Sequence, residues 1–194
     1  MSGHEYRVLS SQQQFHGVIF DVVTDQVTMP GGASARRDYT RHLGAAAVVA
    51  LDDDGRVTLV RQYRHAVRAH LYELPAGLSD VRGESGVRTA QRELAEEVDL
   101  TAAQWNLLVE VHTSPGFSDE LVRVFLARRL SPVADADRHV RRDEEADLTV
   151  HHVPLDEAVA MVFRGEITNG VTAVGLLAAA RARDLDWTPI RPAS

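Results

Sequence analysis

Residues 85–98 constrain the fold more than any other part of the chain, because they carry a helical pattern with one side that must be buried. Apolar residues recur there at spacings of three and four, which places them on one stripe of an α-helix: Val87, Ala90, Leu94 and Val98. A helix with such a stripe is stable in water mainly because the stripe packs against another layer of the protein. The rest of the chain must therefore provide a core for this helix.

Strand-like patterns predict the layer that this helix packs against. Alternating apolar and polar residues at positions 6–29 indicate two or three strands, with a turn around residues 24–26. Mixed strands with helices late in the chain indicate an α/β or α+β fold rather than a regular βαβ array. The other predicted segments are strands at residues 37–42, 45–51, 56–64, 71–74, 105–113, 121–127 and 148–153, loops at 75–84 and 131–145, helices at 155–164 and 168–183, and an irregular tail at 184–194.

The basic residues limit the chemistry that the chain can perform. All 21 of them are arginine, and the chain contains no lysine and no cysteine. This composition excludes Schiff-base and phosphate-loop lysines, thiol nucleophiles, disulfides and cysteine-ligated metal sites. Any metal site must therefore use carboxylates, histidine or backbone oxygen.

Charge and hydropathy narrow the partners and the location of the protein. The net charge of −7 argues against non-specific binding to nucleic acid, although local arginines can still bind small anionic ligands. No apolar run approaches the length of a membrane span, and the N-terminal MSGHEYRVLS has no signal-peptide core. We therefore expect a cytoplasmic protein without a membrane partner, in which 194 residues form one domain with a small appendage.

The same helix carries three glutamates that could do chemistry. Glu93 and Glu97 are four residues apart, so they lie one turn apart on the same side, with Glu96 beside them and the apolar stripe elsewhere. Like charges at this spacing repel by roughly a few tenths of a kcal/mol, and a bridging cation would reverse that penalty. Hard divalent ions such as Mg²⁺ prefer carboxylate oxygens. The helix alone fits both a metal site and a solvated acidic face.

The segment around the helix resembles the Nudix box, whose pattern is G-x5-E-x7-R-E-U-x-E-E-x-G-U, with U an aliphatic residue. Gly77 begins the match, Glu84 is the next fixed acid, and residues 92–100 read R-E-L-A-E-E-V-D-L. The chain departs from the pattern twice: six residues instead of five separate Gly77 from Glu84, and Asp99 replaces the late glycine. We expect the loop to absorb the extra residue near Gly83, and Asp99 to end the helix in a left-handed conformation.

The resemblance implies a metal site and a residue that positions its acids. Arg92 is implied to hold Glu84 or another acid in place, with a surface ion pair to Glu96 as the alternative. Glu97 is implied to be catalytic as well as a ligand. The implied ligands of Mg²⁺ or Mn²⁺ are oxygen donors: Glu93, Glu96, Glu97 and the backbone carbonyl of Ala76.

Further segments resemble the ADP-ribose pyrophosphatase subgroup, above all its actinobacterial members. Pro115, sixteen positions after Asp99, stands where that subgroup has a marker proline. The other matching segments are residues 42–51, 60–64, 73–77, 113–120 and 165–169, the last reading G-E-I-T-N.

The subgroup implies a Nudix fold with a mixed central β-sheet between helices, and an antiparallel N-terminal sheet used to form a homodimer. In these terms, residues 1–35 form the dimerisation region, residues 36–184 the Nudix hydrolase domain and residues 185–194 an irregular tail.

The implied reaction is Mg²⁺-dependent hydrolysis of ADP-ribose to AMP and ribose 5-phosphate. The alternatives are hydrolysis of another nucleoside diphosphate derivative (an NDP-sugar, NADH or an oxidised nucleotide) and a sensor that binds ADP-ribose without turnover. Glu144 is the first candidate for the catalytic base and Glu145 the second, from the acidic run at residues 143–147.

The resemblance also implies residues that contact the substrate. Arg64 suits bidentate binding to phosphate or contact with the terminal ribose. Tyr39, Tyr63 and Phe117 are candidates for stacking on adenine, with a place in the core as the alternative for each. The substrate-binding candidates are Arg64, Glu73, Arg37, Pro115, Ser118 and Asp119.

Overall fold

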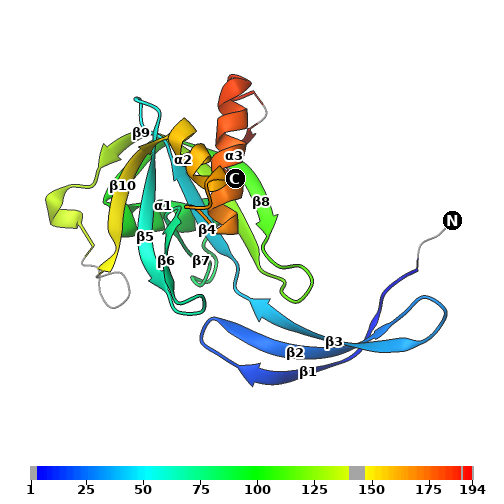
Figure 1. The fold of residues 1–194 in the computed structure, drawn as a ribbon. Helices are drawn as coiled ribbons and strands as arrows, with labels where there is room; N and C mark the ends of the chain where they lie inside the picture. Colours follow the sequence, from blue (N-terminus) through cyan, green and yellow to red (C-terminus); the bar gives the residue numbers. More distant parts are fainter. Residues whose placement is uncertain (1–3, 140–146, 189, 194) are drawn as a thin grey trace. The chain divides into compact units, whose positions relative to one another are not determined.

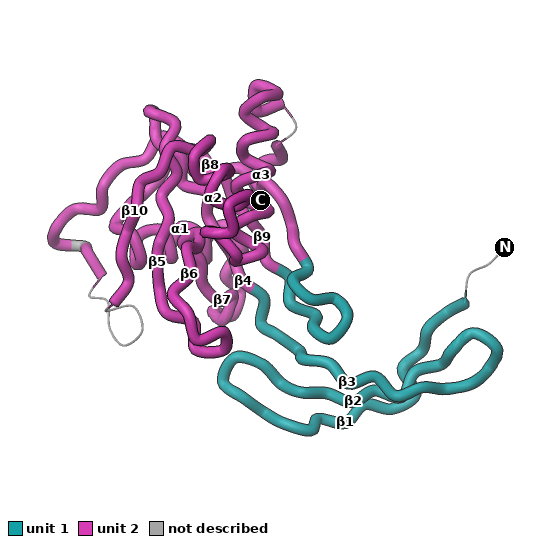
Figure 2. The backbone as a smooth tube through the Cα atoms, viewed as in Figure 1, with its two compact units in different colours: residues 1–44, 112–121 teal, residues 45–111, 122–194 magenta. Residues whose placement is uncertain are grey.

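The protein consists of two compact units, described by a computed structural model over residues 4–139, 147–188 and 190–193. Unit 1 comprises residues 1–44 and 112–121, and unit 2 comprises residues 45–111 and 122–194 (Figure 2).

Unit 1 is built on a three-stranded antiparallel sheet with the order β1-β2-β3 (Figure 1). The strand β1 is exposed along its whole length, and its exposed side chains include Val8, Leu9 and Phe15. The predicted antiparallel N-terminal sheet is therefore confirmed. Its strands are β1 (Val8–His16), β2 (Phe20–Thr28) and β3 (Ser34–His42).

The turn predicted around residues 24–26 is wrong, because these residues lie in the middle of β2. Polar side chains are accommodated there by partners across the strands: the Thr24 hydroxyl donates to Asp38 Oδ1 over 2.6 Å. The chain reverses instead after Gly17 and at Gly31 and Gly32, where φ values of +89° and +87° favour glycine.

The second segment of unit 1 is a loop that adds to β3. The Thr40 amide donates to the Phe117 carbonyl over 2.7 Å, and the Asp119 amide donates to the Thr40 carbonyl over 3.1 Å. The carboxylate of Asp119 accepts from the His42 amide over 2.7 Å. Residues 112–121 are thus held to the sheet mainly by backbone hydrogen bonds.

Unit 2 contains a five-stranded sheet with the order β11-β8-β9-β4-β7. The strand β4 pairs in parallel with β9 and antiparallel with β7, so the sheet is mixed. The strands are β4 (Ala45–Ala50), β7 (Ala76–Leu78), β8 (Leu100–His112), β9 (Leu121–Pro132) and β11 (Arg191–Pro192).

A second sheet of unit 2 has the order β10-β5-β6, and both of its pairings are antiparallel. Its strands are β5 (Arg56–Arg64), β6 (Ala69–Glu73) and β10 (Thr149–Pro154). The helices are α1 (Gly86–Val98), α2 (Leu155–Phe163) and α3 (Gly170–Asp184), with a short 3₁₀ helix at Asp135–Asp137.

Helices cover both faces of the mixed sheet. Because successive side chains of a strand point to opposite faces, Val48 packs with Leu94 of α1 while Val49 packs with Leu176 of α3. The helix α2 adds Leu155 to the α3 side. This arrangement confirms the predicted mixed sheet between helices.

The helix ends follow from local sequence. Asp99 ends α1 in the left-handed conformation expected of it, with φ 56° and ψ 35°, and its amide donates to the Ala95 carbonyl over 3.2 Å. Asn169 begins α3 as the N-cap residue, since its side chain accepts from the Thr172 amide.

Two short strands were missed by the sequence analysis. The strand β7 lies inside the loop predicted at residues 75–84, and β11 lies inside the tail predicted to be irregular. Each has three residues or fewer, so neither is long enough to show a strand pattern, and each forms only by pairing with β4 or β8. Among the described residues, no helix combines the length and the apolar character that crossing a membrane requires.

We predict that truncating Phe125 destabilises unit 2 strongly. Its side chain is 1% exposed and packs with Ala90 and Leu94 of α1, so Phe125→Ala should lower the free energy of unfolding by about 3–5 kcal/mol. The same substitution at Phe163, which is 79% exposed at the end of α2, should change it by less than about 0.5 kcal/mol. Urea unfolding of both variants checks this, and equal losses would contradict the described packing.

Candidate active site

Two glutamates of α1 are buried in unit 2. Glu93 is 7% exposed and Glu97 is 4% exposed, whereas Glu96 is partly exposed. They share the buried face of α1 with Ala90 and Leu94, so the expectation that the apolar stripe lies on a different side of the helix is wrong. A solvated acidic helix face is therefore wrong for Glu93 and Glu97. Buried carboxylates need compensation by positive charge or hydrogen-bond donors, and both are present around α1.

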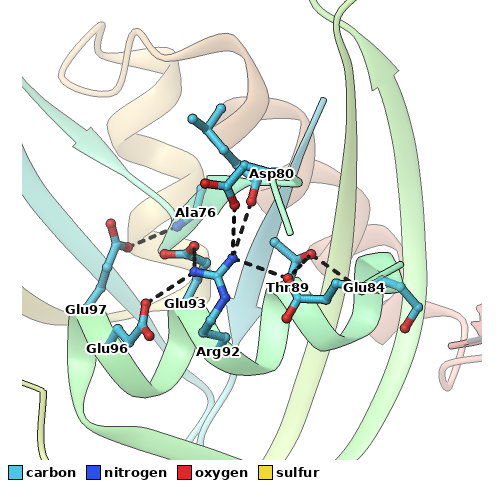
Figure 3. A network of polar contacts seen from close by, with 10 residues as sticks. Ala76, Asp80, Glu84, Thr89, Arg92, Glu93, Glu96 and Glu97 are labelled. Carbon is cyan, nitrogen blue, oxygen red and sulfur yellow. Dashed lines mark hydrogen bonds and ion pairs between the residues drawn. The ribbon is translucent and has the colours of Figure 1, made fainter. Parts of the chain in front are cut away.

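Arg92 supplies the positive charge (Figure 3). Its Nη1 donates to Glu93 Oε1 over 2.5 Å and to Glu96 Oε2 over 3.3 Å. Its Nη2 donates to Glu84 Oε2 and to the Leu78 carbonyl, over 3.3 Å in each case. One guanidinium thus connects α1 with the loop and strand that precede it.

The charge on Arg92 is permanent. Burial alone would lower the pKa of Arg92, but the charges of Glu93 and Glu84 and their hydrogen bonds outweigh this and raise the pKa above its usual value. The carboxylates of Glu93 and Glu84 therefore face a cation at neutral pH. Glu84 is also held from α1 itself, because the Thr89 hydroxyl donates to Glu84 Oε2 over 3.0 Å.

The strand β7 lies directly against the glutamates of α1. The Ala76 amide donates to Glu97 Oε2 over 3.0 Å. A methyl group on the next residue, Gly77, would overlap the carboxylate of Glu93. Glycine is therefore required at residue 77 for the strand backbone and the Glu93 carboxylate to meet.

Arg64 and Glu73 form an ion pair between neighbouring strands of the second sheet. Arg64 Nη2 donates to Glu73 Oε2 over 2.6 Å, and its Nε lies 3.0 and 3.1 Å from the two carboxylate oxygens. Glu73 is 3% exposed, while Arg64 is partly exposed. Gln62, which is also buried, donates to Glu73 Oε2 over 3.2 Å. The buried acid thus orients a guanidinium that reaches the surface.

The donor types at α1 fit a hard divalent ion. Carboxylates and a backbone carbonyl are the ligands that Mg²⁺ and Mn²⁺ prefer, and the absence of a side chain at Gly77 brings the strand backbone against Glu93. In the arrangement seen, Arg92 and the Ala76 amide engage these carboxylates. Over residues 4–139, 147–188 and 190–193, no group of three or more Asp, Glu or His side chains is arranged so that it could hold a metal ion.

The other predicted site residues belong to unit 1 or fall outside the described residues. Arg37, Pro115, Ser118 and Asp119 belong to unit 1. Arg37 is exposed on β3, and its Nη1 donates to the Arg36 carbonyl. Ser118 forms a bridge with Thr40, and its hydroxyl accepts from the Glu120 amide. The candidates for the base, Glu144 and Glu145, lie outside the described residues.

The aromatic candidates differ in exposure. Phe117 is 60% exposed and Tyr63 is 41% exposed, so a place in the core is wrong for both, whereas Tyr39 is partly buried. Burial raises the pKa of Tyr39, and the neighbouring Asp25 raises it further.

Three residues that shape the site were missed by the sequence analysis. Gln62 could have been found, because strand alternation places it on the same face as Arg64. Thr89 lies one turn before Glu93 on α1, so helical spacing could have found it too. Asp80, whose Oδ1 lies 3.7 Å from Arg92 Nη2, is part of an irregular loop, where no sequence pattern could have identified it.

We predict that Gly77→Ala destabilises the protein only while Glu93 is present. The new methyl group overlaps the Glu93 carboxylate, so the free energy of unfolding should fall by about 1–3 kcal/mol. In a Glu93→Ala background the same change should cost almost nothing. Gly170→Ala is the matched control, because a methyl group there meets open space and should change stability by less than about 0.5 kcal/mol. Equal costs of Gly77→Ala in the two backgrounds, measured by urea unfolding, would refute the contact.

Comparison with known proteins identifies the family. The NUDIX domain model matches residues 40–170. ADP-ribose pyrophosphatase from Mycobacterium tuberculosis is 48% identical over 92% of this chain and 84% of its own length, and ADP-ribose pyrophosphatase from Bacillus subtilis is 35% identical over 91% and 93%. The crystal structure of an ADP compounds hydrolase shares the fold, with a TM-score of 0.78, 21% identity, and coverage of 96% of this chain and 98% of that one. The match to the domain model and the identity to these two relatives show that the chain belongs to the NUDIX family.

Proposed function

We propose that the protein hydrolyses the pyrophosphate bond of ADP-ribose, giving AMP and ribose 5-phosphate, with Mg²⁺ or Mn²⁺ as the cofactor. One observation carries this proposal: the helix of the Nudix box presents two buried carboxylates, Glu93 and Glu97, against the backbone of β7. The names of the two NUDIX relatives support ADP-ribose as the substrate.

The proposed ligands are oxygen donors of α1 and β7, namely Glu93, Glu96, Glu97 and the Ala76 carbonyl. A divalent ion held there would neutralise charge on the two phosphates and make a bound water more acidic. Arg92 keeps Glu93 and Glu84 in defined orientations through its hydrogen bonds, and a bound ion would share Glu93 with this guanidinium. Because Glu93 and Glu97 are buried, little water competes for the carboxylate oxygens that face β7.

Arg64 is proposed to contact a phosphate or the terminal ribose. Its Nε and Nη2 are held by Glu73, which fixes the plane of the guanidinium. A planar guanidinium of fixed orientation suits bidentate binding to phosphate oxygens, and it loses little conformational entropy when it binds. Glu73 acts here mainly as the residue that orients Arg64, because it is only 3% exposed. Arg37, Pro115, Ser118 and Asp119 remain proposed contacts from unit 1.

The general base is proposed to come from the acidic run at residues 143–147, with Glu144 ahead of Glu145. A carboxylate of this kind would accept the proton of the attacking water, or orient that water toward phosphorus. We also propose the homodimer that the family resemblance implies, together with a cytoplasmic location. The exposed apolar side chains of β1 support the dimer, because they offer apolar surface for burial.

A panel of substrates tests the proposed function. With Mg²⁺, the protein should hydrolyse ADP-ribose with a higher kcat/KM than ADP-sugars, NADH or oxidised nucleotides, and AMP and ribose 5-phosphate should appear in equal amounts. A higher kcat/KM for an NDP-sugar or an oxidised nucleotide would reassign the substrate. Tight binding of ADP-ribose without turnover would favour a sensor.

Glu97→Gln is the matching test of the metal ligands in the same assay. It keeps the shape of the side chain and removes its charge, so kcat should fall by more than about 100-fold. Glu157→Gln is the control, because Glu157 is exposed on α2 and pairs with Arg164, and its activity should match the wild type. Full activity of Glu97→Gln would end the assignment of Glu97.

We predict that Glu144→Gln lowers kcat by at least about 100-fold, while Glu145→Gln changes it by less than about threefold. Loss of a general base typically costs about 10²–10⁴ in rate. Steady-state rates with ADP-ribose at saturating Mg²⁺, measured across pH, separate the two variants. The reverse ranking would move the base to Glu145, and two active variants would exclude both residues.

A further inference from the structure

Residues 165–169, G-E-I-T-N in the sequence, have no part in the proposed chemistry. The last of them, however, begins a helix that contacts the chain next to the proposed site. Asn169 is the N-cap of α3, and its Oδ1 accepts from the Thr172 amide over 2.9 Å. The cap thereby fixes the first turn of α3, in which Thr172 stands. Thr172 is 1% exposed, so its hydroxyl points into unit 2 rather than to solvent.

The hydroxyl of Thr172 contacts the backbone at a distant point of the chain. It accepts a hydrogen bond from the Leu74 amide over 3.0 Å, across 98 residues of sequence. Helix α3 can come this close because Gly175 has no side chain, since a methyl group there would lie 2.7 Å from Leu74 Cδ1. Leu74 itself is 1% exposed.

Leu74 stands where the chain crosses from one sheet of unit 2 to the other. The pairing of β6 with β5 ends at Glu73, and the pairing of β7 with β4 begins at Ala76. Only Leu74 and Pro75 lie between, and the Pro75 carbonyl accepts from the Val48 amide over 2.9 Å. The Thr172 hydroxyl therefore fixes the backbone of Leu74, and the Val48 amide fixes that of Pro75.

The two ends of the crossing carry the two halves of the proposed site. On one side, Glu73 holds Arg64, which is assigned to the substrate. On the other side, the Ala76 amide holds Glu97, which is assigned to the metal. The distance between these halves depends on the course of two residues, and a misplacement of about 1 Å between reacting groups can cost about 100-fold in rate.

We propose that Thr172 is a positioning residue, whose hydroxyl fixes the Leu74 amide and so sets the spacing between the substrate contact and the metal ligands. This inference rests on the proposed function of the same site. A purely structural role differs from it in one respect. If the hydroxyl only satisfies a buried amide, its loss lowers stability and leaves the turnover of the folded protein unchanged.

The test compares Thr172→Val, which removes the hydroxyl at nearly constant shape, with Thr172→Ser, which keeps it. Thr58→Val is the matched control, because Thr58 is also 1% exposed and its hydroxyl contacts His152 rather than the site. Four quantities are measured for each variant: kcat and KM for ADP-ribose, the Mg²⁺ concentration for half-maximal activity, and Tm.

Both valine variants should lose stability, with Tm lower by about 2–10 °C. Only Thr172→Val should also lose turnover, with kcat lower by about tenfold and with KM and the half-maximal Mg²⁺ concentration within about threefold of wild type. Thr172→Ser should restore kcat to within about twofold. A wild-type kcat in Thr172→Val, an equal loss in Thr58→Val, or no rescue by serine would each overturn the proposal.

Asn169→Ala gives a second route if Thr172→Val does not fold. Removing the cap loosens the first turn of α3 while keeping the hydroxyl, so kcat should fall in the same direction by about threefold. Unchanged kcat in a folded Asn169→Ala would then count against the proposal.

Hydrogen exchange separates this proposal from the proposed function. Deuterium uptake at residues 71–78 should rise in Thr172→Val and stay at the wild-type level in Thr58→Val, whichever substrate the protein hydrolyses. A wild-type protein that is inactive on ADP-ribose would refute the proposed function alone. The kinetic comparison would then use the nucleoside diphosphate derivative that the wild type does hydrolyse. Unchanged uptake in Thr172→Val would refute the positioning role.

Discussion

Two carboxylates buried on one helix are the constraint on which the rest of unit 2 depends. Moving a carboxylate out of water costs several kcal/mol unless opposite charge and hydrogen-bond donors replace the water. Arg92 does so for Glu93, for which Gly77 leaves room, and the Ala76 amide does so for Glu97. The position of β7 against α1 is therefore set by electrostatics as much as by apolar packing.

The layered core turns this local requirement into a defined place in the fold. The strand β4 has α1 on one face and α3 on the other, and it pairs with β7 along its edge. The helices α1 and α3 and the strand β7, which all contribute to the site, are thus all in contact with β4. Rigid elements hold functional groups more accurately than loops do, and the described groups at Glu93, Glu97 and Arg64 all lie on helices or strands.

Local features were predictable from the residues themselves, and the sheet layout was predictable from the family resemblance, but single contacts between distant segments were not. The helix of residues 85–98 and the left-handed Asp99 follow from apolar spacing and from the preferences of single residues. The prediction of a turn at residues 24–26 was wrong, because polar residues in a strand can form hydrogen bonds with partners across the sheet. The roles of Asp80 and Thr172 depend on segments that are separated in sequence and meet only in the folded chain.

The contact between Leu74 and Thr172 also has a consequence for the order of events during synthesis. The hydroxyl that Leu74 needs is made 98 residues later, and the parallel partner of β4, strand β9, likewise follows a long interval. Contacts between distant segments form slowly, because a long loop must close before they form. A nascent chain that has produced the whole Nudix box therefore still lacks the crossing in its final form. The hydrogen bond between Leu74 and Thr172 can form only once α3 has left the ribosome.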